Sequence, residues 1–231
     1  KGVDASIQNL LDTLTQEEQF ASSINMTGLH RTNSEIERRN TLQERIFGGY
    51  AQYKTAALNM GLAAIHHSYD NVFNRTEQPY NQFDFRGKEL FNISADYSYV
   101  FKNTNIFGEV VRSGSGAVGF LQGAMVALDS RVSLSTMYRH YPRNFHTFYS
   151  QGFSEGSRTQ NESGIFVGLF WRLGGAWTVN TYIDFFKFPW LRYQVDAPSS
   201  GTEFLTQLSY KPNRSFCPIQ DITHNTKFRV K

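Results

Sequence analysis

Apolar and polar residues alternate with a period of two along most of the chain after Arg45, which predicts β-strands. The clearest run is Phe91 to Phe101, where large apolar side chains occupy the odd positions and mostly polar ones the even positions. The alternation returns along the chain and predicts nine strands, at 46–54, 58–69, 91–101, 106–112, 117–128, 132–141, 165–173, 177–186 and 202–211.

The connections between these strands differ in length in a regular way. Short turns alternate with longer loops at 70–88, 143–164 and 189–201, and the connection at 113–116 is the one short exception on the long side. The short turns are expected at 55–57, 102–105, 129–131, 174–176 and 212–214. Short turns at one end, long loops at the other and strands of about 9 to 13 residues are typical of an up-and-down barrel that crosses a membrane. The expected fold class is therefore all-β: an antiparallel up-and-down transmembrane β-barrel, part of a larger barrel with an even number of strands.

A soluble β-sandwich or lipocalin-like barrel shows the same alternation, with its apolar face inside. Two features favour the membrane. Aromatic residues gather at strand ends, as in Phe185, Phe186 and Trp190, where interfacial girdles are expected. The polar face also carries charged residues suited to a wet or salt-bridged lumen, namely Asp96, Glu109, Arg139, Asp184 and Glu203.

The first 44 residues differ from the strand region, so we divide the chain into an N-terminal segment, 1–44, and barrel strands, 45–231. Residues 7–18 have mild helical periodicity, and Thr32 to Glu37 has the pattern of a short capped helix. We expect one or two small helices here, around an extended piece at 20–29. This segment would plug the barrel, lie in the periplasm or lead into the first strand.

Composition narrows the class of protein. The chain has 231 residues, of which 40% are hydrophobic and 15% aromatic, so a folded core is expected. Apolar runs are far shorter than the roughly 18–20 residues of a membrane-spanning helix, and residues 1–5 lack the layout of a signal peptide. A single cysteine, Cys217, excludes an internal disulfide. The formal net charge of +3, spread along the chain, gives no reason to expect nucleic-acid binding.

Several specific segments resemble a family of large Bacteroidota envelope proteins, the helix-hairpin-helix or ComEA-like proteins. The segments are 78–85, 97–100, 139–146 and, most specifically, 188–201. The resemblance covers about residues 20–211 and implies that this part is an outer-membrane β-barrel. Residues 1–40 carry no helix-hairpin-helix signature, so the family's DNA-binding role has no residues here. The last residues, 227–231, lack the terminal aromatic residue common in outer-membrane barrels, so we expect a piece of a longer protein.

Catalytic and metal-binding residues are not expected. His66 and His67 point to opposite faces of a strand and cannot chelate one ion together. Ser150, Ser154 and His146 supply the residue types of a hydrolase in one loop, but no nucleophile motif accompanies them. We expect no cofactor and no metal.

The loop at 189–201 is the clearest binding candidate. It combines aromatic anchors with opposite charges: Trp190, Arg192, Tyr193 and Asp196. These residues would bind a ligand or partner by stacking and bidentate arginine contacts. Alternatively, the loop folds back to make the barrel mouth rigid, with Arg192 and Asp196 paired. The five charged residues of the polar face likewise form interior salt bridges or a selectivity site.

The expected function is that of a non-enzymatic outer-membrane protein, either a transport channel or a subunit of an envelope complex. Its expected partners are outer-membrane lipid and other envelope proteins. Two alternatives stay open: a soluble β-barrel that binds an apolar ligand, and a barrel associated with DNA uptake.

Overall fold

The computed structural model describes residues 1–10, 18–25, 27–174, 176–210 and 220–230, and almost all of its regular structure is β-strand. The elements are β1 (Gly2–Val3), β2 (Ala5–Leu10), β3 (Glu18–Ile24), α1 (Asn33–Glu37), β4 (Leu42–Lys54), β5 (Leu58–Phe73), β6 (Gly87–Phe101), β7 (Thr104–Ser113), β8 (Val118–Asp129), β9 (Val132–Tyr141), β10 (Glu162–Gly174), β11 (Trp177–Phe188), β12 (Ser199–Tyr210) and β13 (Gln220–Val230). No helix within these described ranges is long and apolar enough to cross a membrane.

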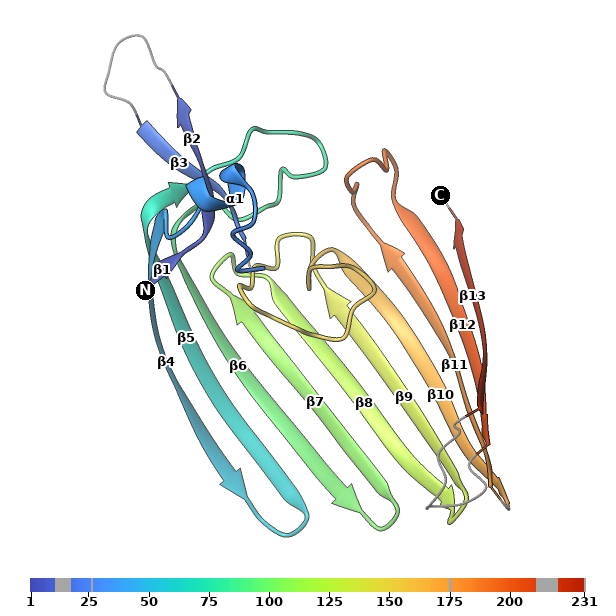
Figure 1. The fold of residues 1–231 in the computed structure, drawn as a ribbon. Helices are drawn as coiled ribbons and strands as arrows, with labels where there is room; N and C mark the ends of the chain where they lie inside the picture. Colours follow the sequence, from blue (N-terminus) through green and yellow to red (C-terminus); the bar gives the residue numbers. More distant parts are fainter. Residues whose placement is uncertain (11–17, 26, 175, 211–219, 231) are drawn as a thin grey trace.

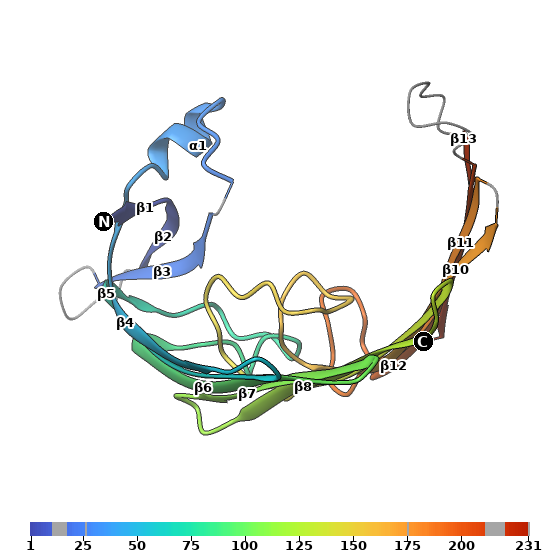
Figure 2. The same ribbon diagram turned by 90° about the horizontal axis from the view of Figure 1, so that it is seen from below.

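Strands β4 to β13 form one antiparallel sheet in which each strand pairs with its neighbours in sequence (Figure 1). This up-and-down order and all nine expected strands are confirmed. The sheet curves into an open arc, with β4 and β13 at separate edges (Figure 2). The described strands therefore form an open, curved sheet and not a closed barrel.

The two faces of the sheet carry different side chains, because successive residues of a strand point to opposite faces. The long loops lie on the concave side of the arc (Figure 2). Arg139 contacts one of these loops, so the register Leu121↔Arg139↔Gly164 identifies the concave positions on β8, β9 and β10. The opposite, convex face exposes large apolar side chains on successive strands, among them Phe47, Leu62, Phe91, Ile93, Val110, Val118, Ile165, Trp171, Phe185 and Phe204.

The N-terminal segment corrects one expectation. The predicted helix at 7–18 is wrong where the structure describes it, because residues up to Leu10 belong to β2 and Glu18 begins β3; residues 11–17 lie outside the described ranges. Ala5 and Ile7 alternate with polar residues, so the sequence of this short segment is compatible with a strand as well as a helix. Its pairing with β3 makes it a strand. The helix predicted at 32–37 is confirmed as α1, whose N-cap Thr32 forms a capping box with Glu35.

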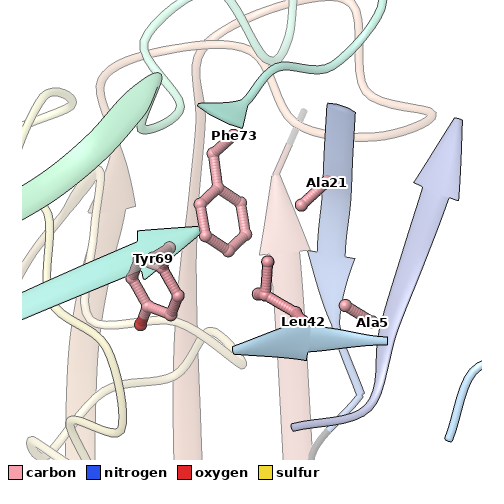
Figure 3. Packing of buried hydrophobic residues seen from close by; sticks show 5 residues of the cluster. All are labelled: Ala5, Ala21, Leu42, Tyr69 and Phe73. Carbon is pink, nitrogen blue, oxygen red and sulfur yellow. The ribbon is translucent and has the colours of Figure 1, made fainter. Parts of the chain in front are cut away.

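A small hydrophobic cluster attaches the N-terminal hairpin to the sheet (Figure 3). Ala5 from β2 and Ala21 from β3 are fully buried against Leu42 of β4 and Tyr69 and Phe73 of β5. Strand β3 also pairs in parallel with the end of β5, through Phe20↔Val72 and Ala21↔Phe73. The N-terminal hairpin is thus packed on the edge of the sheet at the end that carries the long loops.

A further strand, β13, follows the last predicted one. It pairs with β12 along its whole length, from Ser200↔Val230 to Tyr210↔Gln220. Its polar sequence lacks the strong apolar alternation of the other strands, which is why the pattern did not predict it. The short turn expected at 212–214 lies outside the described residues.

Candidate functional site

Three long loops, 74–86, 142–161 and 189–198, meet over the concave face at one end of the sheet (Figures 1 and 2). The Trp190 indole N–H donates to the Pro79 carbonyl oxygen at 2.9 Å. The Asn161 side chain makes two bonds with the Trp190 backbone, accepting from its N–H at 2.8 Å and donating to its carbonyl at 3.0 Å. These bonds join all three loops into one unit.

A buried ion cluster fixes the middle loop to β9, β10 and β11. The Arg139 guanidinium donates to Glu162 at 2.6 Å and to both oxygens of Asp184 at 2.9 and 3.0 Å. Arg139 and Glu162 are fully buried and Asp184 is nearly so. A bidentate arginine pair with a second carboxylate satisfies most of the charged groups that burial removes from water.

The ion cluster requires a glycine beside the Arg139 guanidinium, and its Glu162 also binds the backbone of loop 142–161. Gly164 lies across from Arg139, and a Cβ there would come within 2.5 Å of the guanidinium carbon. Glu162 accepts the backbone N–H groups of Glu155 and Gly156, at 2.8 and 2.9 Å. The Phe153 ring covers the guanidinium, 5.0 Å from its centroid. The ion cluster therefore also determines the path of loop 142–161.

A second buried carboxylate, Glu44, fixes the same loop to the other side of the arc. Glu44 accepts the hydroxyl of Tyr69 at 2.7 Å and that of Tyr149, from the loop, at 2.9 Å. Burial and the bond to Glu44 raise the pKa of Tyr149, so its hydroxyl stays protonated and donates. Phe148 of the loop packs against Tyr69 and Phe73 beside this bond.

His146 connects the loop at 142–161 with the loop at 74–86. Its Nε2–H donates to the Phe83 carbonyl oxygen at 2.7 Å, and its ring packs edge-on against Phe85. Burial lowers the pKa of His146, against the opposing effects of the Phe83 carbonyl and the Asp84 carboxylate. The ring is therefore neutral at pH 7 and holds the two loops together in that form.

We expect acidification to loosen this contact. Because the folded-state pKa lies below the ordinary value of 6.5, the detached loop binds the proton more tightly than the folded one. The stability that neutral His146 adds to the loop contact is fully present above pH 6.5. It is lost as the pH falls from 6.5 through the pKa of His146 in the folded protein. Hydrogen exchange of residues 142–161, corrected for intrinsic rates, should be faster at pH 5 than at pH 7.5. His146→Gln should abolish most of that difference, and a His146→Gln protein with the same pH dependence would contradict this account.

All five charged residues predicted for the lumen lie on the concave face. In the register of the sheet, Asp96 lies directly opposite Glu109, and Asp184 lies directly opposite Glu203. Arg139 and Asp184 form the expected interior ion pair. Glu203 accepts the Tyr182 hydroxyl at 2.7 Å. The middle of the concave wall is therefore rich in carboxylates.

The predicted residues of the last loop take separate places. Trp190 packs edge-on against Phe83, with centroids 5.2 Å apart, and Tyr193 packs against Tyr80 at 5.6 Å. Arg192 lies over the Phe188 ring, 3.7 Å from its centroid. The loop thus folds back onto the mouth of the arc. Asp196 is exposed, and its pairing with Arg192 stays a prediction.

The three residues noted as the types of a hydrolase each bond another partner. The Ser150 hydroxyl bonds that of Thr159, Ser154 donates to the Gly156 carbonyl, and His146 donates to Phe83. Across the described residues, no three histidine, cysteine or carboxylate side chains are grouped to hold a metal ion.

The sequence analysis missed three functional residues. Glu162 lies in the loop predicted at 143–164, although extending the strand predicted at 165–173 backwards by three residues places it on the same face as Gly164. Glu44 precedes the first predicted strand, and Arg143 was noted only as part of a family segment. Continuing the period-two pattern past each predicted strand end would have found both carboxylates.

No family model, curated protein or solved structure matches the chain.

Proposed function

We propose that this chain forms part of the wall of an outer-membrane β-barrel and acts without catalysis, as a transport channel or as a subunit of an envelope complex. The observation that carries the proposal is the distribution of side chains between the two faces. Large apolar residues are exposed on the convex face, whereas the buried and half-buried carboxylates lie on the concave one. An apolar exterior with a polar interior is what a barrel wall in lipid requires.

The position of charges on the convex face supports this reading. By register, the charged residues at convex positions on β4, β6, β7 and β11 all lie near the long-loop end: Arg45, Glu89, Arg112 and Lys187. Below Glu89 on β6, the apolar run from Phe91 to Phe101, at about 3.3 Å per residue and a tilt of about 40°, covers about 25 Å. That is the height of a lipid-facing band. Arg112 of β7 lies opposite Ile93, near the upper end of this run. The chain's partner on this face would be outer-membrane lipid.

The soluble alternative fits these faces less well. A ligand-binding barrel or sandwich encloses its apolar face. Here the concave side carries the ion cluster of Arg139, Glu162 and Asp184 and is covered by the three long loops. The resemblance to Bacteroidota envelope proteins agrees with the membrane proposal, as does the high aromatic content.

Membrane partitioning tests the proposal. The full chain, expressed with an export signal in a Gram-negative host, should be found in the outer-membrane fraction and should require detergent for extraction. Its band on a denaturing gel should shift between unheated and heated samples, because intact β-barrels resist the detergent. A protein that is monodisperse without detergent and shows no shift would overturn the proposal and favour the soluble alternative.

A further inference from the structure

A cavity of ≈ 380 Å³ lies between the three long loops, within the range of about 300–1,000 Å³ typical of small-ligand pockets. Its charged lining is four arginines and one carboxylate: Arg75, Arg143, Arg158, Arg192 and Asp84. The Oδ2 atom of Asp84 lies 3.2 Å from Nη1 of Arg158 and 3.7 Å from Nη1 of Arg75, so one carboxylate is shared between two guanidinium groups. The cavity therefore has an excess of positive charge, in contrast to the carboxylate-rich wall below it.

Arg143 is the residue best placed to bind an anion. Its guanidinium lies over the Phe83 ring, 4.2 Å from the centroid, and 5.1 Å from the Trp190 centroid. It forms no ion pair with any residue in the described part of the chain. Stacking on rings orients a guanidinium but leaves its in-plane N–H groups free for a carboxylate or phosphate.

Aromatic side chains supply the other half of the pocket. Tyr80, Trp190 and Tyr193 line it, and Tyr193 is 68% exposed. The faces of such rings carry partial negative charge and attract the polarised C–H groups of a sugar ring. Trp190 is already fixed by its bonds to Pro79 and Asn161, so little ordering is left to oppose binding.

We propose that this pocket binds a small acidic sugar, a saccharide ring that carries a carboxylate or a phosphate. The Arg143 guanidinium, in a pocket with an excess of positive charge, recognises the anion, and the aromatic residues recognise the ring. The loops lie on the concave side of the arc, away from the apolar convex face (Figure 2). The ligand is therefore a soluble sugar rather than the headgroup of a surrounding lipid. The site does not depend on the membrane proposal, because its lining comes from the three loops and from Phe188, the last residue of β11.

Calorimetric titration of the purified full chain tests the proposal. The probes are digalacturonate and glucose 6-phosphate, with maltose as the neutral ring and inorganic phosphate as the anion without a ring. At least one acidic sugar should bind, more tightly than phosphate, and maltose should not bind measurably. Arg143→Lys keeps the charge but loses the planar fork, and should weaken binding about tenfold.

Arg131→Lys is the matched control, because Arg131 is an exposed arginine in a short turn at the opposite end of the sheet. It should bind like the parent protein. Unchanged circular dichroism would show that Arg143→Lys is folded, and Arg143→Gln provides a second variant. Equal affinity for maltose and the acidic sugars, no binding of either acidic sugar, or full affinity in both Arg143 variants would overturn the proposal.

Discussion

Replacing Arg139 with leucine is expected to lower the free energy of unfolding by about 3–5 kcal/mol, the usual cost of breaking a buried ion pair by removing one partner. The substitution leaves Glu162 and Asp184 buried without the guanidinium that bonds both. It also frees Gly164 from its tight contact with that group. Denaturant titration of the detergent-folded protein, followed by tryptophan fluorescence, measures the loss.

Two further variants separate the charge effect from simple loss of packing. Combining Arg139→Leu with Glu162→Gln and Asp184→Asn removes all three charges and should recover a substantial part of the stability, because the uncompensated charges are gone. Arg172→Leu, a matched change at an exposed concave position of β10, should cost less than about 1 kcal/mol. Equal losses for Arg139→Leu and Arg172→Leu would show that the buried cluster does not stabilise the fold.

The second large effect is expected on the convex face. Ala95→Arg should destabilise the protein in lipid vesicles by about 2–4 kcal/mol, because Ala95 lies on the convex face near the middle of the apolar band, where arginine is costly in lipid. Ser94→Arg is the matched control, since the neighbouring residue of β6 points to the concave face. It should cost much less. Urea unfolding in vesicles measures both.

The outcome distinguishes the two accounts of the faces. In a soluble β-protein with an enclosed apolar face, Ala95→Arg would bury a charge and abolish folding in aqueous buffer. If both arginine variants unfold at the same urea concentration in vesicles, the convex face does not contact lipid, and the proposed function fails with it.

The strands β6, β9, β11 and β12 could be predicted from the sequence because the period-two pattern runs along most of their length, whereas β4, β5, β7, β8 and β10 follow it less strictly. Phe91 to Phe101 alternates over its whole length, and the structure pairs it on both sides as expected. The segment at 5–10 is too short for the helical and strand periods to be distinguished, and β13 lacks apolar contrast. In both cases pairing with a neighbouring strand, which a local pattern does not contain, decides the structure.

The candidate site was predicted in part. The shared face of Asp96, Glu109 and Arg139 follows from alternation within strands, so the sequence analysis found it. The contact of Tyr149 with Glu44 joins residues 105 positions apart, and the stacking of Arg143 on Phe83 depends on how two loops meet. Such contacts follow from the curvature of the sheet and have no signature in residue spacing.

Loop 142–161 bridges the concave face between two buried carboxylates, Glu44 on β4 and Glu162 on β10 (Figure 2). In a β-barrel, diameter grows with the number of strands. A segment attached at both sides limits how far the sheet can flatten, and so sets a largest radius for the wall. The strand segments of this chain fix the number of its strands, but the length of this one loop acts on the curvature of the sheet: shortening it would curve the arc more tightly, although no residue of the strands had changed.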